Sequence, residues 1–318
     1  MLPSRMPARC AAILVVCAAA AISWTGCNPS RPSGKPEPPR VELEDGFGRK
    51  VTVPSPAERI VSIAPSNTEI LFAIGAGPLL VARDDLSDHP PAAMALPAIG
   101  LTSSTLRRET LLAFEPDLVL GAEINGLDSV KPIESLGFPV FLLRNPRTFQ
   151  DLGSNIIAVG RLTDRVEAAT ELATSLNARV RAVEERLGGV ATQPTVYYEL
   201  DGTDPSRPWT VGAGEFPDML IGTARGVNLG ARFGGSFPRI SIENIIRADP
   251  DILVIGDATR KLEPADIARR AGWEELRAVR EGRVHIFDDN LASRPGPRLV
   301  EGLEELARIL HPELFPGG

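Results

Sequence analysis

The stretch DRVEAATELATSLNARVRAVEERL, from Asp164 to Leu187, carries the strongest helical pattern in the chain. Its apolar residues recur every three or four positions, as they do along one face of a helix, and Gly188-Gly189 follows directly. These residues are Val166, Ala169, Ala173, Leu176, Val180, Val183 and Leu187. The sequence therefore predicts one long helix near the middle of a chain of 318 residues.

Short apolar runs lie on both sides of this helix and are separated by helix-like segments. Before it stand RIVSIAP, LLVAR, DLVLGA and FPVFLL, and after it stand TVYYEL, WTVGA, DILVIG and VHIFD. Strands that alternate with helices favour mainly parallel sheets. We predict an α/β fold of two Rossmann-like lobes, with a hairpin at Val41–Val53. The predicted boundaries are 41–160 for the N-terminal lobe, 161–189 for the bridging helix and 190–318 for the C-terminal lobe.

The two halves also share a repeated segment. ETLLAFEPDLVLG begins at Glu109 and ENIIRADPDILVIG begins at Glu243, and in each copy the Glu stands seven residues before a Pro-Asp pair. Each copy predicts a short helix followed by a buried strand, with a carboxylate in the first turn of the helix.

The N-terminus is typical of an exported lipoprotein. Arg5 and Arg9 precede an apolar run, AAILVVCAAAAI, that is too short to span a bilayer. We predict a signal peptide over 1–26, diacylation of Cys27, and a Pro-rich tether over 27–40. The alternative is an ordinary signal peptide cleaved elsewhere, because Trp24 stands where an aliphatic residue is usual.

Composition excludes several classes of protein. Removing residues 1–26 changes the net charge from −7 to −9, and an acidic surface disfavours nucleic-acid binding. The chain contains no phosphate-binding G-x-x-x-x-G-K-[ST] loop and no G-x-S-x-G motif. No cysteine follows Cys27, and the three histidines are dispersed, so we expect no metal site built by the protein and no cofactor of its own. We predict that the chain is not an enzyme.

The chain resembles the cobalamin- and iron-siderophore-type substrate-binding proteins of ABC importers. The motifs that carry the resemblance run from 41 to 310 in the order of that family. They are RIVSIAPSNTEILFAIGAG, DLSDHPP, the repeated segments, the long helix, WTVGAGEFPDML, RGVNLG and SRPGPRLVEGLEELARIL. The resemblance implies a metal-chelate-binding fold, in which a rigid helix bridges two lobes and the ligand lies between them.

The resemblance also implies roles for the repeated carboxylates and for the partners. In the family, one surface Glu on each lobe docks onto arginines of the permease, and the motifs place this role on Glu109 and Glu243. The alternative is that each Glu only interacts with a helix dipole, which contributes about 0.3–1 kcal/mol. The implied partners are an ABC permease, its ATPase and a small-molecule chelate. We expect a monomer that touches the membrane through its lipid anchor only, at the periplasmic or outer face of a bacterial membrane.

Candidate ligand-binding residues lie in loops that the resemblance places at the cleft. They are Ser66, Asn67, Asp88, His89, Trp209, Phe216, Phe237 and Arg294. Aromatic residues suit a large flat ligand, and Arg294 suits an acidic group. The alternatives are a capping box at Ser66–Glu69, core packing for the aromatic residues, and surface roles for His89 and Arg294.

The motif set lies nearest the cobalamin branch, so cobalamin or another corrinoid is the first candidate ligand. Ser103 and Leu86 stand where that branch leads us to expect aromatic residues, which leaves a ferric siderophore or haem as the alternative. Two further alternatives are an enzyme that processes a chelate and a scaffold lipoprotein without a transport role.

Overall fold

The computed structural model describes residues 39–100, 108–257 and 261–316. Residues 38–318 form a unit of their own, and the fold below is the fold of that unit. The signal peptide, Cys27, most of the tether and Ser103 lie outside the described residues. Among the residues that are described, no helix is long and apolar enough to cross a membrane.

The predicted hairpin is present at the start of the unit. Strands β1 (Arg40–Glu44) and β2 (Lys50–Pro54) pair antiparallel, with Leu43 opposite Val51. Asp45 closes the turn, because its Oδ1 accepts the N–H groups of Phe47 at 2.9 Å and Arg49 at 3.0 Å.

Four parallel strands form the N-terminal sheet, in the order β4-β3-β5-β6. They are β3 (Ile60–Ser62), β4 (Leu80–Arg83), β5 (Leu118–Ala122) and β6 (Val140–Leu143). Every residue of β3, β5 and β6 is buried, as is usual for parallel strands that are covered on both faces. The helical segments of this half are α1 (Pro65–Ala73), η1 (Gly77–Leu79), η2 (Pro91–Ala95), α2 (Arg108–Phe114), η3 (Glu123–Asn125) and α3 (Leu127–Glu134).

The C-terminal sheet is mainly parallel and has one antiparallel strand. Its strands are β7 (Thr195–Asp201), β8 (Trp209–Thr210), β9 (Val227–Asn228), β10 (Ile252–Ile255) and β11 (Val284–Ile286). The order is β11-β10-β7-β8, with β9 also paired to β7, and only β8 runs antiparallel among these described strands. The helical segments are α6 (Phe216–Thr223), η4 (Gly230–Phe233), α7 (Ile242–Ala248), α8 (Pro264–Ala268), η5 (Trp273–Glu275), α9 (Arg277–Arg280), α10 (Asn290–Ser293), α11 (Leu299–Leu310) and η6 (Pro312–Leu314).

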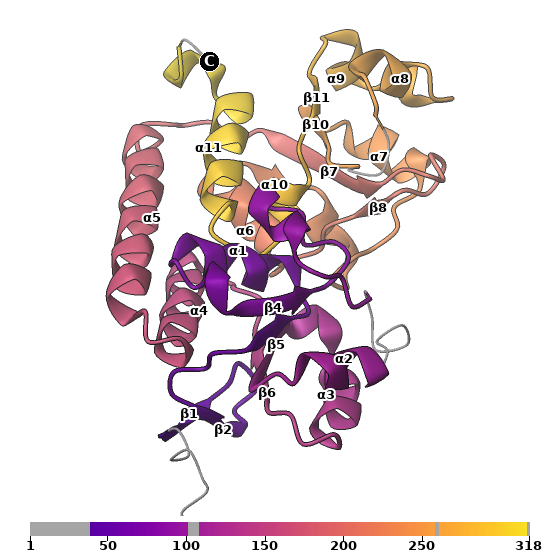
Figure 1. The fold of residues 1–318 in the computed structure, drawn as a ribbon. Coiled ribbons are helices and arrows are strands. Elements are labelled where there is room, and N and C mark those ends of the chain that lie inside the picture. The colour runs from indigo at the N-terminus through magenta and orange to yellow at the C-terminus, as the bar shows by residue number, and fades with distance from the viewer. Residues whose placement is uncertain (1–38, 101–107, 258–260, 317–318) are drawn as a thin grey trace, which may run out of the picture. The chain divides into compact units, whose positions relative to one another are not determined.

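Two helices that lie side by side, α4 (Phe149–Leu162) and α5 (Val166–Arg186), connect the halves (Figure 1). They approach closely at Gly160, where an added Cβ would lie 2.5 Å from the Cβ of Ala169. Helix α5 confirms the predicted long helix, and the predicted stripe from Ala169 to Val183 is buried. Val166 is 45% exposed, so the buried stripe begins one turn later than the sequence pattern indicated.

The largest group of buried apolar residues joins both sheets through α5. It includes Ile60 and Leu118 of the first sheet, Leu176 and Val183 of α5, and Val254 of the second sheet. A separate cluster covers the other face of each sheet. Apolar packing therefore holds the bridging helix against both lobes, and the predicted two-lobed α/β architecture is confirmed.

Candidate functional site

Helix α1 follows β3 directly and carries the first predicted ligand residues. Its N-cap is Ala64, with extended backbone (φ −149°, ψ 138°), and Pro65 occupies the first helical turn. Proline is favoured there because its missing N–H would have no partner within the helix. The predicted capping box at Ser66–Glu69 is therefore wrong: both residues lie inside the helix, and no side chain caps it.

Glu69 instead forms a buried ion pair with the C-terminal part of the chain. Its carboxylate accepts two hydrogen bonds from Arg298, at 3.0 Å from Nε and 2.6 Å from Nη2. The two side chains are 3% and 15% exposed. The backbones meet beside this pair, because a Cβ on Gly296 would lie 3.3 Å from the Ser66 carbonyl oxygen.

A second ion pair extends this cluster toward the solvent. Arg294 Nη1 lies 2.5 Å from Asp88 Oδ1 and 3.6 Å from Glu69 Oε1. The hydrogen bond from Arg294 lowers the pKa of Asp88, and the hydrogen bond to Glu69 raises the pKa of Arg298. Two carboxylates of the first half thus face two guanidinium groups of the segment between α10 and α11.

A buried carboxylate, Asp84, holds the loop that carries Asp88. Asp84, which is 2% exposed, accepts the Leu86 N–H at 2.8 Å and the Ser87 hydroxyl. Burial raises the pKa of Asp84. The Ser87 hydroxyl also lies 2.8 Å from Thr68 Oγ1, so the loop is tied to α1.

Three polar residues that were predicted to bind ligand lie close in sequence to Glu69 or Asp88. Ser66 and Asn67 are buried in the first turn of α1, and His89 is half-buried next to Asp88. Neither amide atom of Asn67 has a hydrogen-bond partner within the described residues. In that part of the chain, no group of three or more His, Cys, Asp or Glu side chains is placed to hold a metal ion.

Trp209 and Phe237 lie on two backbone segments that run side by side. Thr210 donates its N–H to the Pro238 carbonyl at 2.9 Å, and Gly212 donates to Ser236 at 2.8 Å. The segments approach so closely that a Cβ on Gly212 would lie 1.8 Å from the Gly235 oxygen.

Both aromatic rings of this pair are exposed to solvent. Trp209 is 43% exposed and Phe237 is 44% exposed. The Arg239 guanidinium lies 5.5 Å from the centre of the Trp209 ring and is held by Asp204 at 2.6 Å. The pair therefore presents flat apolar surface outside the core.

Phe216 is not part of this exposed surface. It is the first residue of α6, it is 6% exposed, and it packs in the core cluster shared by the two lobes. A side chain engaged in the core presents little surface to a ligand, and the ligand role of Phe216 stays a prediction.

The two repeated carboxylates occupy equivalent places on their helices. Glu109 lies in the first turn of α2 and Glu243 in the first turn of α7, and both are exposed. A hydrogen bond from Ser241 is the main cause that lowers the pKa of Glu243. The Glu243 carboxylate is thus charged at neutral pH, and both side chains are reachable from solvent.

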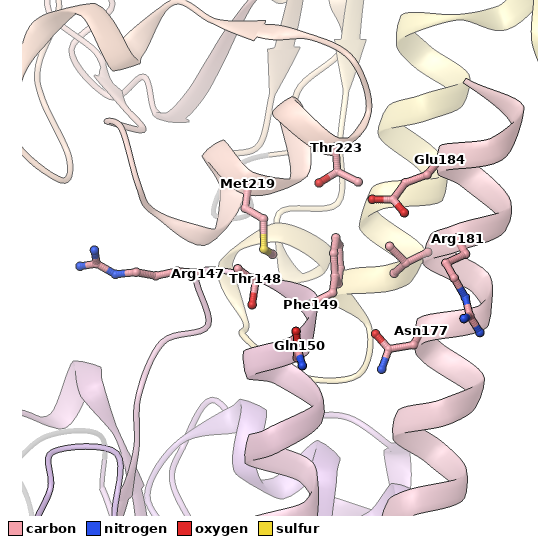
Figure 2. Close-up of a pocket in the computed structure, with 10 residues that line it drawn as sticks. Arg147, Thr148, Phe149, Gln150, Asn177, Arg181, Glu184, Met219 and Thr223 are labelled. Carbon is pink, nitrogen blue, oxygen red and sulfur yellow. The ribbon is translucent and has the colours of Figure 1, made fainter. Parts of the chain in front are cut away.

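A cavity of about 520 Å³ lies where α4, α5 and α6 meet. Figure 2 shows Phe149 rising from the start of α4 toward α6, which contributes Met219 and Thr223, while Arg147 extends away. Of the described residues predicted for ligand binding, none lines this cavity. It borders both lobes and the bridging helix.

Sequence reasoning missed the buried ion pair of Glu69 and Arg298, which joins the two halves. Glu69 and Arg298 are 229 residues apart in the chain, so no local pattern connects them. A signal did exist: Arg294 and Arg298 stand four residues apart in SRPGPR, a short segment without an acid of its own. Two such cations are candidates for ion pairs with carboxylates from elsewhere in the fold.

The chain matches the family described as periplasmic binding protein over residues 60–291. It belongs to that family. An ABC transporter substrate-binding lipoprotein of Bacillus subtilis, YvrC, described as uncharacterised, is 28% identical over 307 residues, which are 93% of this chain and 95% of that protein. The vitamin B12-binding protein of Vibrio cholerae is 27% identical over 259 residues, which are 81% of this chain and 90% of that protein.

Solved structures support the same family. The periplasmic vitamin B12-binding protein BtuF of Vibrio cholerae has a TM-score of 0.70 at 26% identity, and the match covers 83% of this chain and all of that one. A periplasmic heme-binding protein of Pseudomonas aeruginosa has a TM-score of 0.71 at 28% identity, with 80% and 93% coverage. These matches confirm the resemblance that the sequence motifs indicated.

Proposed function

We propose that this chain is the substrate-binding protein of an ABC importer, which captures a metal chelate between its lobes and delivers it to the permease. Cobalamin or another corrinoid is the first candidate ligand. The family and the vitamin B12-binding relatives support this assignment. The permease and its ATPase are the protein partners, and Glu109 and Glu243 are the docking residues.

The observation that carries the ligand proposal is the exposed aromatic pair, Trp209 and Phe237. A corrin or porphyrin offers a broad face that buries well against flat rings. In this proposal, the ion pair of Asp88 and Arg294 supplies polar groups for the edge of such a ligand. Ser66, Asn67 and His89 complete the proposed set of contacts.

Haem or a ferric siderophore is the second candidate. The similarity to the heme-binding protein of Pseudomonas aeruginosa favours it. So does Leu86, which is 50% exposed in the loop of Asp88 and offers no ring for stacking.

Truncation of the aromatic pair tests the ligand site. We expect Trp209→Ala and Phe237→Ala each to weaken cyanocobalamin binding roughly tenfold, because each removes a stacking surface that contributes about 0.5–1.5 kcal/mol beyond its buried area. Isothermal titration measures the affinities. Phe233→Ala, a similarly exposed residue of η4, is the control and should change affinity little. Unchanged affinity in both aromatic variants would contradict this placement of the ligand.

We propose that the mature chain is lipid-anchored through Cys27 at the periplasmic or outer face of the membrane. The lipoprotein relative of Bacillus subtilis supports this location. Metabolic labelling with a fatty acid should mark the natural chain and leave Cys27→Ala unlabelled. Labelling that persists in the variant would contradict the anchor.

We also propose that the chain binds its ligand without changing it, as a monomer. Ligand recovered after incubation should be chromatographically identical to the ligand added. A time-dependent product would instead support a chelate-processing enzyme.

A further inference from the structure

Arg294 carries a charge that has little access to water. Its side chain is 11% exposed, so the guanidinium depends on the carboxylates that the fold places beside it. Two carboxylates lie beside it: Asp88 Oδ1 is 2.5 Å from Arg294 Nη1, and Glu69 Oε1 is 3.6 Å from the same atom.

The two carboxylates differ in how easily they can be displaced. Glu69 is 3% exposed and already accepts two hydrogen bonds from Arg298, so its departure would leave buried charge without a partner. Asp88 is 57% exposed and makes one hydrogen bond to Arg294, so water replaces that bond at little cost.

The turn before Asp88 is held in place, so only the exposed Asp88 side chain has to leave Arg294. Asp84 fixes the turn before it, and Ser87 ties that turn to Thr68 of α1. The same helix carries Glu69, which keeps Arg294 in position when Asp88 is withdrawn. Arg294 is therefore a preoriented cation whose outer partner can be exchanged.

We propose that Asp88 sets the charge preference of the ligand site by occupying Arg294 until an anionic group of the ligand replaces it. The inference rests on the proposed function and deepens it: the preferred chelate carries a carboxylate or a similar anionic group near its edge. A neutral ligand leaves the Asp88–Arg294 pair intact and gains nothing from the guanidinium. The exchange keeps Arg294 paired, and the displaced Asp88 carboxylate, which is 57% exposed, is solvated by water.

The test compares ligands that differ by one charge. The mature chain from residue 28 is titrated calorimetrically with cyanocobalamin and with its monocarboxylic acid, in which one amide side chain is hydrolysed. Haem monomethyl ester and haem dimethyl ester, which differ by one free propionate, form a second matched pair. The measured quantity is the ratio of affinities for the charged and the neutral member of each pair.

We expect Asp88→Asn to raise this ratio about threefold to tenfold, because the carboxylate that competes for Arg294 is gone. Asp85→Asn, an exposed change on the same loop, removes the same charge and should leave the ratio near that of the natural chain. In the Arg294→Gln background, Asp88→Asn should have no effect on the ratio.

A ratio that stays unchanged or falls in Asp88→Asn overturns the inference while the transport proposal stands. A ratio that rises equally in Asp85→Asn also overturns it, since a general charge effect then explains the result. If the natural chain binds no member of either pair, the proposed corrinoid or haem ligand fails and this inference fails with it.

Discussion

Asn67 departs from ordinary protein chemistry. Its side chain is fully buried, and within the described residues neither its amide nitrogen nor its amide oxygen has a hydrogen-bond partner. Leaving such a group unpaired costs about 1–3 kcal/mol of stability. Residues that cost stability in this way are found mainly at functional sites. Asn67 therefore stays in the proposed set of ligand contacts.

Asn67→Leu should therefore stabilise the ligand-free chain by about 1–3 kcal/mol, because it replaces a buried amide without a partner by an apolar group of similar size. Urea denaturation followed by circular dichroism measures the free energy of unfolding. Asn125→Leu is the matched control, since Asn125 accepts the Ala122 N–H at 2.8 Å and donates to the Ile63 carbonyl at 2.9 Å. That control should be destabilised. A loss of stability in Asn67→Leu would show that the amide has partners.

Asp289 gives a prediction about pH. Burial is the main cause that raises its pKa above the ordinary value of 3.8, while hydrogen bonds from Ser293 and Tyr198 act in the opposite direction. Because the folded state holds this proton more tightly than the unfolded state, the contribution to stability is complete below pH 3.8 and is lost as the pH rises through the folded-state pKa.

Asp289→Asn should consequently gain stability relative to the natural chain as the pH rises from about 4 to neutrality. Urea denaturation of both proteins at several pH values gives the difference. A difference that stays constant, or that changes in the opposite direction, would contradict the raised pKa.

At the scale of elements, the pair of Glu69 and Arg298 fastens α1 to the segment that leads into α11. Helix α1 belongs to the first lobe, and α11 packs on α5 and α6. The pair is therefore a contact between two segments that are distant in the sequence. It lies on the same side of α1 as Gly296.

Glu69→Gln should lower the free energy of unfolding by about 3 kcal/mol, because it leaves Arg298 buried without a charged partner. Chemical denaturation measures this loss. Glu304→Gln is the control, since Glu304 also accepts two hydrogen bonds from an arginine, Arg179, but the side chains are 27% and 38% exposed. The control should lose about 1 kcal/mol or less. Equal losses would indicate that burial does not decide the contribution of these pairs.

At the scale of the whole molecule, the repeated segments offer two carboxylates for docking. Exposed charges at a polar interface set orientation and association rate more than affinity. We expect the double variant Glu109→Ala, Glu243→Ala to bind ligand normally and to stimulate its transporter roughly tenfold less than the natural chain. ATPase activity of the reconstituted importer measures the stimulation. Full stimulation by the double variant would contradict the docking proposal.

The shared core along α5 predicts that the lobes move little when ligand binds. The bridging helix packs against both sheets through one continuous apolar cluster, so a wide hinge motion would expose that cluster to water. Small-angle scattering with and without ligand should give nearly the same radius of gyration. A large decrease would contradict the rigid bridge.

Much of this fold could be predicted from the sequence. The long helix and the buried strands carry strong local patterns, and the apolar residues of α5 and β6 lie where those patterns indicated. The start of α1 could not be predicted in this way, because the S-x-x-E pattern competes with Pro65 for the N-terminus of the helix.

The candidate site was less predictable than the fold. Asp88 and Arg294 were both singled out, but their direct contact joins residues 206 apart in the chain, and only tertiary packing decides such a pairing. Phe216 shows the converse: an aromatic residue in a loop-like segment proved to be the buried start of α6.

The most direct test of the account is isothermal titration of the mature chain, from residue 28 onward, with cyanocobalamin. The account predicts saturable binding of one ligand per chain, with the ligand recovered unchanged. Binding of haem or a ferric siderophore in its place would retain the transport role and correct the ligand. No binding to cobalamin, haem or any ferric siderophore tried would contradict the claim that this chain captures a metal chelate.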